Sequence, residues 1–437
     1  MNDVNYIYGV VPDNWKKMKI KHFYELYSGG TPLSSVDSNY AEEGVCFVNI
    51  SDMTNTEYIT DTTKKLTDKG IKNKNLKILK SGTILYSIYA SLGSVSELKT
   101  KATISQAILA LIPKMGISID KNYLKFLLMI AKENIFYFSN GTTQSNLNAD
   151  IVNNLPLIIP ELNNQIRISL YVGNKTLIIN KLIDNQKQQI EKLKEYKQSL
   201  ISEVVTKGLN PNVEFKDSNV KCIGLIPKNY DVSLISRHTF VTKLAGFEFT
   251  EILSKNINEF DDIPIVRAQN IKNDKFIKDF TGYINNDTAR KLVRSNLDKP
   301  CILMTFIGAG VGEVAIFNEE KLHQLAPNVA KIEILKSHED RISLRYLLYY
   351  LMSNAANFEK DQYLKATAQP NISMTIIRGL RFVLPPIDDQ NKIIKYLDNK
   401  VLRLDELIEL KNKKIDELYN YKKSLIYEYV TGKKEVS

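Results

Sequence analysis

Two long stretches of the chain carry positions spaced alternately by three and four residues, the pattern of a helix that packs along another helix. In the first stretch these positions are Ile183, Gln186, Ile190, Leu193, Lys197, Leu200 and Val204. In the second stretch they are Ile408, Lys411, Ile415, Leu418, Lys422, Leu425 and Tyr429. No proline interrupts either stretch. The pattern predicts two long helices, at about residues 163–206 and 388–431, that form a coiled-coil seam with each other.

The segment before each helix has the pattern of a mixed α/β globule. Short β-branched runs predict strands at residues 45–50, 83–88, 263–266 and 301–306. Apolar amphipathic runs predict helices at 123–130 and 344–351, and each globule closes on an apolar strand that ends in proline, at 155–160 and 382–386. We therefore expect a mixed α/β (α+β) fold. It would have globular domains at residues 1–160 and 209–386 and spacer helices at 161–208 and 387–437. The alternative is that each helix packs only on its own globule, but so long a seam needs an equally long partner.

The chain contains one module twice. The sequence YKQSLISEVVT at residues 196–206 returns as YKKSLIYEYVT at residues 421–431, with eight of eleven positions identical. The same offset of 225 residues relates Pro160 to Pro385 and Gln165 to Gln390. A repeat this long is a whole module, because solenoid units run about 20–50 residues. We expect the two helices to be antiparallel, with a pseudo-two-fold axis that relates the globules, so that both globules can face one DNA duplex, which has two-fold axes of its own.

Composition narrows the class of protein. Of the 437 residues, 43% are hydrophobic and 25% charged, as in ordinary globular proteins. No apolar run reaches the length of a membrane span and the amino terminus is not signal-like, so we expect no membrane association and a cytoplasmic location. The three cysteines and four histidines have no metal-ligand spacing, so we expect reduced thiols and no metal site. The net charge of +10 favours a polyanionic partner.

Several motifs, most of them doubled, are similar to those of one family. Residues 159–165 (IPELNNQ) and 384–390 (LPPIDDQ) resemble an LPPLxEQ motif that begins a spacer helix, and KQSLISEVVT and KKSLIYEYVT resemble a KxSLIxEVVTG motif that ends it. VPDNW at 11–15 and IPKNY at 226–230 resemble an IPxxW opening, SGGTP at 28–32 a glycine–Thr–Pro turn, and GTILYS at 82–87 a GDILxS strand. The second module departs at 245–247 (AGF) and 299–301 (KPC). The family is the specificity subunit of type I restriction–modification systems, and the resemblance covers essentially the whole chain.

The resemblance implies a non-catalytic protein with two target-recognition domains, each reading one half of a bipartite, asymmetric sequence in double-stranded DNA. The two helices would hold the domains at a fixed separation. The family also implies assembly with two methyltransferase subunits and with restriction subunits. No cofactor is then expected on this chain, because S-adenosylmethionine, ATP and Mg²⁺ would be bound by the partner subunits.

One motif suggests a different reading. Phe306-Ile-Gly-Ala-Gly310 matches the FxGxG pattern of methyltransferases, but a glycine turn after a strand is the favoured interpretation. The chain has no (D/N)PP(Y/F) loop to hold an extruded adenine, no GxGxxG spacing, no Walker A sequence and no HExxH. A self-sufficient DNA methyltransferase is therefore the less favoured alternative. A coiled-coil scaffold that tethers two protein-binding domains is the other.

The side chains that could read bases differ between the two modules. The first contains 17 lysines and no arginine before Arg167, whereas eight arginines lie between residues 211 and 385. We therefore expect lysine, amide and hydroxyl groups, rather than an arginine–guanine fork, to read the first half-site. Candidate DNA contacts are Thr31, Lys64, Lys65, Lys99, Lys101, Gln144 and Asn146 in the first module, and Arg267, Gln269, Arg290, Arg294, Gln369 and Asn371 in the second. The Gln-x-Asn pairs recur at the 225-residue offset, which makes them poorer candidates for specificity.

Overall fold

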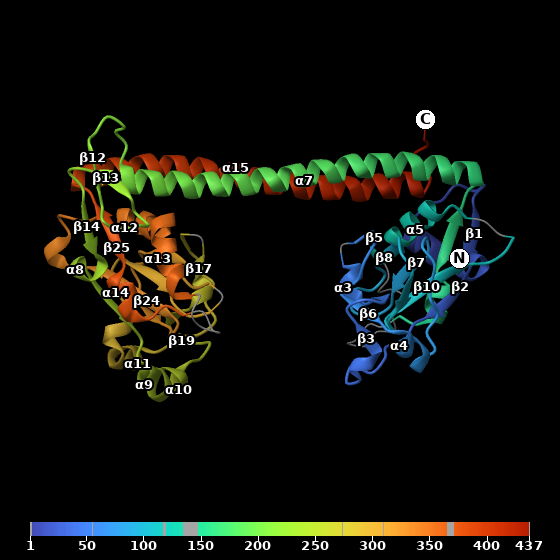
Figure 1. The fold of residues 1–437 in the computed structure, drawn as a ribbon, viewed down its shortest axis with the longest axis horizontal. Coiled ribbons are helices and arrows are strands. Elements are labelled where there is room, and N and C mark those ends of the chain that lie inside the picture. The colour runs from blue at the N-terminus through green and yellow to red at the C-terminus, as the bar shows by residue number, and fades with distance from the viewer. Residues whose placement is uncertain are drawn as a thin grey trace. The chain divides into compact units, whose positions relative to one another are not determined.

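The computed structural model describes residues 2–54, 56–116, 119–133, 147–272, 274–308, 310–364 and 371–436 (Figure 1). The chain divides into two compact units, one of residues 1–186 with 413–437 and the other of residues 187–412. Each unit contains one globule and a part of both long helices, α7 (Leu162–Lys207) and α15 (Ile387–Val430). The two long helices predicted from the sequence are thereby confirmed. No helix in the described part of the chain is long and apolar enough to cross a membrane.

The globule of the first unit contains two main sheets, with strand orders β2-β10-β7-β8-β5 and β3-β6-β4-β9. Its core draws buried residues from both sheets, among them Val48 of β4, Leu85 of β7 and Ala110 of β10. The strands are β1 (Lys16–Lys19), β2 (Tyr24–Ser28), β3 (Tyr40–Ala41), β4 (Val45–Val48), β5 (Tyr58–Ile59), β6 (Lys64–Leu66), β7 (Ile84–Ser87), β8 (Val95–Leu98), β9 (Ala102–Ile104), β10 (Ile108–Pro113) and β11 (Pro156–Ile159). The helices are α1 (Asn2–Tyr8), α2 (Ile20–Phe23), α3 (Ile50–Met53), α4 (Asp68–Asn73), α5 (Lys121–Glu133) and α6 (Ala149–Asn153).

The globule of the second unit also contains two main sheets, ordered β15-β24-β21-β22 and β19-β16-β23-β20. Its strands are β12 (Phe215–Asp217), β13 (Leu225–Pro227), β14 (Asp231–Leu234), β15 (Thr239–Lys243), β16 (Ile263–Val266), β17 (Ile271–Lys272), β18 (Lys275–Phe276), β19 (Tyr283–Ile284), β20 (Asn296–Leu297), β21 (Cys301–Thr305), β22 (Val314–Phe317), β23 (His323–Leu325), β24 (Val329–Ile334) and β25 (Arg381–Leu384). Its helices are α8 (Ile235–His238), α9 (Gly246–Glu248), α10 (Ser254–Asn256), α11 (Asn286–Lys291), α12 (Leu344–Met352), α13 (Asn354–Leu364) and α14 (Met374–Gly379). Every strand and helix predicted from the sequence is present, with small shifts at the ends.

The two globules share one four-strand frame. In the first, Leu111 of β10 lies opposite both Leu26 of β2 and Ile84 of β7. In the second, Ile332 of β24 lies opposite Val241 of β15 and Ile302 of β21. The order β2-β10-β7-β8 therefore corresponds to β15-β24-β21-β22. This register identifies equivalent positions in the two globules independently of sequence identity.

Each globule is tied to its helices by a buried tyrosine. The hydroxyl of Tyr123 on α5 is 3.1 Å from the carbonyl oxygen of Ile158 and 3.0 Å from that of Val430 at the end of α15. In the second unit, the hydroxyl of Tyr346 on α12 is 3.0 Å and 2.9 Å from the carbonyl oxygens of Val383 and Val205. These buried hydroxyls satisfy carbonyls that the end of each helix leaves without a partner.

The doubled glutamine of the LPPLxEQ-like motif has the same role in both units. Gln165 donates from Nε2 to the carbonyl of Pro160 at 2.9 Å, and its Oε1 accepts from the backbone N–H of Asp120 at 2.9 Å. Gln390 donates to the carbonyl of Pro385 at 2.8 Å and accepts from the N–H of Ser343 at 2.9 Å. The glutamine therefore joins the start of each long helix to the segment that begins α5 or α12.

The IPxxW-like opening and the end of each long helix meet in a contact that requires glycine. Gly432 has φ +75°, and a Cβ there would lie 2.9 Å from the Trp15 ring. Gly208 has φ +74°, and a Cβ there would lie 2.6 Å from the Tyr230 hydroxyl. Only glycine combines a left-handed helix end with so close an approach. Trp15 and Tyr230, the last residues of the doubled VPDNW and IPKNY sequences, are therefore equivalent.

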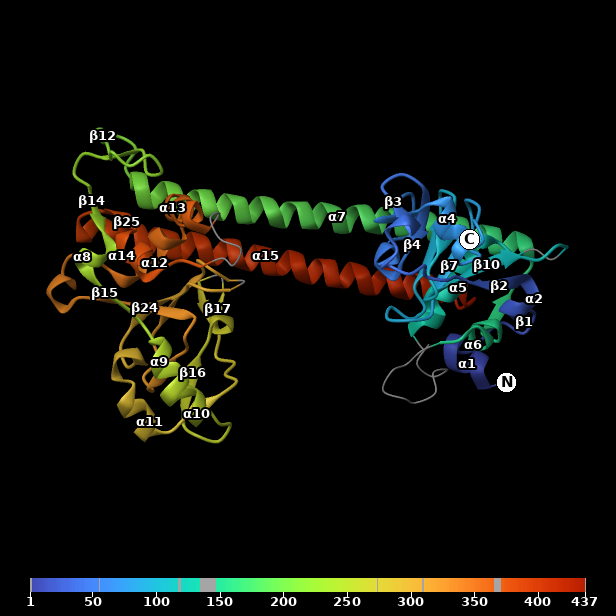
Figure 2. The ribbon, with the colours of Figure 1, turned by 60° about the horizontal axis from the view of Figure 1, so that its bottom comes forward.

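Within each unit α7 and α15 lie side by side (Figures 1 and 2). The predicted seam positions are all buried or half-buried, among them Ile183, Ile190, Leu193, Leu200, Val204, Ile408, Ile415, Leu418, Leu425 and Tyr429. In the first unit Tyr171 contacts Tyr429, with ring centroids 4.7 Å apart, and Asn180 accepts from Lys422 at 2.8 Å. The later residue of α7, Asn180, contacts the earlier residue of α15, Lys422, so the two helices are antiparallel in this unit.

The second unit shows the same direction. Gln189 of α7 accepts from Lys411, and Lys197 donates to Asp405 of α15 at 2.9 Å. Lys197 and Lys422 are equivalent under the 225-residue offset, as are Asn180 and Asp405. The two polar seam contacts are therefore copies of one another, with an amide acceptor in the first unit and a carboxylate in the second.

Candidate nucleic-acid interface

Two of the lysines predicted to contact DNA lie on β6 of the first unit. Lys65 forms an ion pair with Asp61 at 3.3 Å. Lys64 is exposed, with Nζ 5.7 Å from the centroid of the Tyr40 ring. Lys101 is exposed between β8 and β9, and its side chain makes no hydrogen bond or ion pair with the described part of the chain. These three lysines keep their ammonium groups accessible to an anion.

Thr31 belongs to a turn that the backbone requires. A Cβ on Gly29 would lie 2.1 Å from the carbonyl oxygen of Ile104, which no side chain can tolerate. The N–H of Gly30 donates to the same carbonyl at 3.1 Å, and the carbonyl of Pro32 accepts from Tyr40 at 2.8 Å. The glycines of SGGTP therefore let two backbone segments approach closely. Thr31 is half-buried in this turn.

The candidates in the second unit lie on loops and short helices. The half-buried Arg267 has a buried Nε without a hydrogen-bond partner in the described structure. Gln269 is exposed and lies 3.5 Å from the Thr281 hydroxyl. Arg290 pairs with Asp287 at 3.4 Å across an exposed turn of α11. Arg294 and Asn371 are also exposed; Asn371 forms a β-bridge with Ile307. Gln144, Asn146 and Gln369 lie outside the described residues.

The structure brings together a charged cluster that the sequence pattern did not reveal. Glu97, on β8, is only 2% exposed. Its Oε1 accepts from Lys99 at 2.9 Å and from Lys121, at the start of α5, at 2.8 Å. Its Oε2 accepts from the buried Lys125 at 3.2 Å, and Lys125 also donates to Glu57 at 3.2 Å. One buried carboxylate therefore holds three ammonium groups.

An aromatic ring completes this cluster. The centroid of the Tyr58 ring lies 4.4 Å from Nζ of Lys99 and 4.6 Å from Nζ of Lys125, within the range of a cation–π contact. Burial alone would raise the pKa of Glu97, but hydrogen bonds from Lys121, Lys99 and Lys125 outweigh burial and lower it to about 2. Burial would lower the pKa of Lys125, but the charge of Glu57 raises it. Both groups therefore stay charged at neutral pH.

The second unit has an apolar pair at the equivalent positions. Glu97 lies opposite Ile84 on β7, and Ile316 lies opposite the equivalent Ile302 on β21. Tyr123 of α5 and Tyr346 of α12 are equivalent. Leu348, two residues after Tyr346, is therefore the equivalent of Lys125, two residues after Tyr123. Leu348 is fully buried and Ile316 packs against its core cluster. Where the first unit has a buried ion pair, the second therefore has two apolar side chains that belong to one core cluster.

The Phe306–Gly310 motif is a hairpin turn rather than a cofactor loop. It begins after β21, and the N–H of Gly312 donates to the carbonyl of Thr305 at 2.8 Å as the chain returns into the antiparallel strand β22. A glycine loop that binds a nucleotide leads from a strand into a helix, whose N-terminus faces the ligand. The strand that follows here removes the structural basis for the methyltransferase reading.

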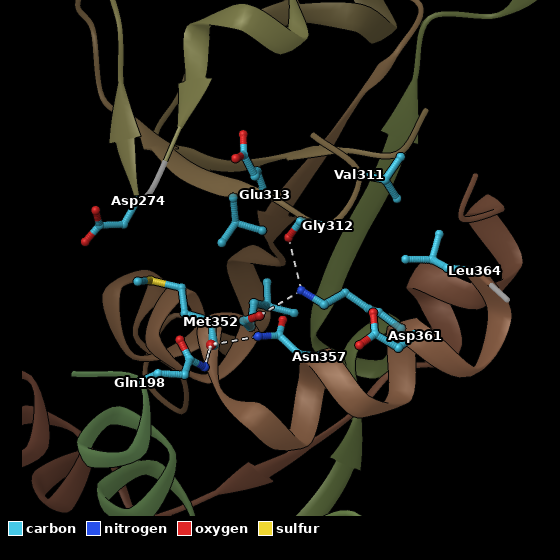
Figure 3. Close-up of a pocket in the computed structure, with 12 residues that line it drawn as sticks. Gln198, Asp274, Val311, Gly312, Glu313, Met352, Asn357, Asp361 and Leu364 are labelled. Carbon is cyan, nitrogen blue, oxygen red and sulfur yellow. Dashed lines mark hydrogen bonds between the residues drawn. The ribbon is translucent and has the colours of Figure 1, made fainter. Parts of the chain in front are cut away.

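A cavity of about 380 Å³ lies beside this turn (Figure 3). Lys360 on α13 is 97% buried, and its Nζ donates to the carbonyls of Gly312 and Leu351 at 3.0 Å each. Burial lowers its pKa to about 8. The carboxylates of Asp274, Glu313 and Asp361 approach from different elements without converging in Figure 3, and the described residues contain no metal-binding group of His, Cys, Asp and Glu.

Comparison with known proteins identifies the class. The family described as Type I restriction modification DNA specificity domain matches residues 12–193 and 247–420. The chain therefore belongs to this family and contains the specificity domain twice. It is a specificity subunit of a type I restriction–modification system, the recognition component rather than the catalytic one.

The relatives support the assignment over the full chain. The MjaVIII specificity subunit of Methanocaldococcus jannaschii is 24% identical over 427 residues, covering 97% of this chain and 93% of the relative. The MjaIX specificity subunit of the same organism is 23% identical over 432 residues, covering 98% and 95%. A chain from a solved structure concerned with complex assembly and conformational transition of the type I restriction–modification system has a TM-score of 0.69 at 14% identity, covering 96% of this chain and 98% of that chain. That likeness concerns the fold.

Proposed function

We propose that this chain reads a bipartite, asymmetric DNA sequence, with one half-site contacted by each recognition domain. The main observation behind the proposal is that the two globules have the same four-strand arrangement but different candidate contact residues. The four-strand register and the tyrosine and glutamine anchors are the same in both units, whereas the predicted contact residues include lysines but no arginine in the first unit and include arginines in the second. A scaffold for two identical partners would need no such divergence, but two unlike half-sites require it.

The first recognition domain, residues 1–160, reads its half-site without arginine. Its donors are Thr31, Lys64, Lys65, Lys99 and Lys101, with Gln144 and Asn146. The second domain, residues 209–386, contributes Arg267, Gln269, Arg290, Arg294, Gln369 and Asn371. The exposed lysines contact phosphates and set affinity, whereas amide and guanidinium groups are suited to the base edges. The spacer helices, residues 161–208 and 387–437, set the length of the gap between half-sites.

Two methyltransferase subunits dock on the helices in our proposal. Exposed apolar residues recur at equivalent positions of the two helices, Leu182 with Leu407 and Tyr196 with Tyr421. The seam contacts set Tyr421 level with Leu182 in the first unit, and Tyr196 level with Leu407 in the second. A duplicated leucine–tyrosine pair in each unit suits two copies of one partner. Restriction subunits then join this assembly, and S-adenosylmethionine, ATP and Mg²⁺ are bound outside this chain. We expect the complex to act in the cytoplasm, on chromosomal DNA.

Selection from a random duplex pool tests the recognition proposal. The chain is assembled with its partner methyltransferase, and bound duplexes are recovered and sequenced. We expect two short, unlike sequences separated by a gap of fixed length. Recovery of no shared sequence, or of one continuous sequence, would contradict the proposal.

The double substitution L182S/L407S tests the docking surface, and we expect it to weaken co-purification of the methyltransferase while the chain stays folded.

A further inference from the structure

We propose that Glu97 is a positioning residue that holds Lys99 and Lys121 as a clamp for a DNA phosphate in the first recognition domain. This inference rests on the proposed DNA-binding function and adds a defined contact to it. It assigns a role to Glu97 and Lys121, which sequence analysis did not select, and joins them to the predicted contact Lys99.

The geometry presents two cations together. The ammonium nitrogens of Lys99 and Lys121 are 2.9 Å and 2.8 Å from the same carboxylate oxygen, so they lie within about 6 Å of each other. Their side chains are 45% and 41% exposed, whereas that of Glu97 is 3% exposed. An ammonium group has three donors, so each lysine keeps donors for a second acceptor. The clamp therefore faces solvent and its anchor does not.

The charge balance favours an anionic partner. Lys99, Lys121 and Lys125 bring three positive charges to the cluster, and Glu57 and Glu97 bring two negative charges. The exposed Lys101, two residues after Lys99, adds another positive charge. Because this domain lacks arginine, clustered lysines are its means of binding phosphate. An anchored lysine also loses less side-chain entropy on binding than a freely moving one.

Stability alone does not account for the buried charges. Removing a carboxylate and an ammonium from water costs several kcal/mol per ion, and replacing such a pair by packed apolar residues is often neutral or stabilising. The second unit shows that the frame accepts that replacement, since Ile316 and Leu348 stand at the positions of Glu97 and Lys125. The equivalents of Lys99 and Lys121 in that unit are Asn318 and Leu344, which are not cationic. The buried anchor and the exposed lysines therefore occur together in one unit and are both absent from the other.

The test uses the full chain and a labelled duplex of mixed sequence, with affinity measured at several salt concentrations. For K99Q/K121Q we expect the slope of log affinity against log salt to become shallower by about one to two units. The matched control K16Q/K17Q removes the same charge from exposed lysines of β1 and should change the slope less. Equal slopes for the two double variants would overturn the clamp.

The variant E97I/K125L tests the positioning role separately. It copies the apolar pair of the second unit, removes one positive and one negative charge, and leaves net charge unchanged. We expect it to melt at or above the temperature of the natural chain and to bind the duplex several-fold more weakly, because Lys99 and Lys121 lose their anchor. Unchanged affinity would overturn the role of Glu97; if the variant fails to fold, K99Q/K121Q still decides the clamp. A folded natural chain that binds no duplex at all, alone or with its methyltransferase, would instead refute the proposed function.

Discussion

The two recognition domains place different chemistry at the same point of one strand frame. Glu97 and Lys125 form a buried ion pair in the first domain, and Ile316 and Leu348 pack as hydrocarbon in the second. The strands on either side keep the same register in both. The comparison shows that the same strand frame forms with either a buried ion pair or two apolar side chains at these positions. The side chains that differ are then available for what distinguishes the two domains, the DNA that each reads.

The largest loss of stability should come from single substitutions that put the residue of one domain at the equivalent position of the other without changing its neighbour. The single change E97I leaves the buried Lys125 with only the exposed Glu57 and the Tyr58 side chain as partners, and I316E places a carboxylate at a half-buried position against the apolar core. Each should lower the unfolding free energy of its unit by about 3 kcal/mol. The double variant E97I/K125L should stay within about 1 kcal/mol of the natural chain. Urea denaturation of the full chain measures all three, and an E97I cost under about 1 kcal/mol would break the comparison.

Acid should distinguish the two domains next. The pKa of Glu97 is lowered from 4.5 to about 2 in the folded protein, so its stabilisation is present above pH 4.5 and is lost as the pH falls toward 2. By linkage this loss is on the order of 2–3 kcal/mol. Thermal melting of the natural chain should therefore fall more steeply between about pH 5 and pH 2 than that of E97I/K125L. Parallel pH profiles would show that the carboxylate is not held in this way.

The shared anchors should respond equally in both domains. Y123F and Y346F each leave buried carbonyls without the tyrosine hydroxyl, which should cost about 1–2 kcal/mol in either unit. Hydrogen exchange at the ends of α7 and α15 measures the effect where it arises. A large loss of stability in one unit and none in the other would show that the two tyrosines are not equivalent, although the strand register is the same.

The smallest effect should come from the polar seam contacts. D405N gives the second unit the neutral acceptor of the first, and N180D gives the first unit the carboxylate of the second. We expect D405N to destabilise and N180D to stabilise by about 0.5 kcal/mol each, both reduced at high salt. Thermal melting at two salt concentrations measures them, and shifts of the same sign would contradict the equivalence of these positions.

Sequence alone predicted the elements whose information is local or repeated. The three-and-four spacing revealed both long helices and their seam, and the identical YKxSLI segments revealed the duplication. The buried seam at Ile190 and Ile415 follows directly from that spacing. The antiparallel direction was expected because it lets both duplicated globules face one DNA duplex; the matching lengths of the two helices do not set it.

The Glu97 cluster could not be predicted in this way, because its members are distant in sequence. Lys121 and Lys125 come from α5, 24 and 28 residues after Glu97, and Glu57 comes from a loop 40 residues before it. In the strand sequence VSEL, Glu97 has the appearance of an ordinary solvent-facing residue. Only the register against β7 and the approach of α5 turn it inward. The doubled tyrosines were similarly read as apolar helix residues, although their hydroxyls join each globule to a helix end.

The central claim is that one chain carries two unlike DNA readers on a duplicated frame. Methylation profiling by single-molecule sequencing tests it most directly. The chain is expressed with its methyltransferase, and in a second strain residues 209–386 are replaced by a further copy of residues 1–160. We predict that the natural chain directs modification to two unlike half-sites separated by a fixed gap, and that the replacement converts the target into two inverted copies of one half-site. An unchanged target in the second strain, or modification with no bipartite pattern in the first, would contradict the account.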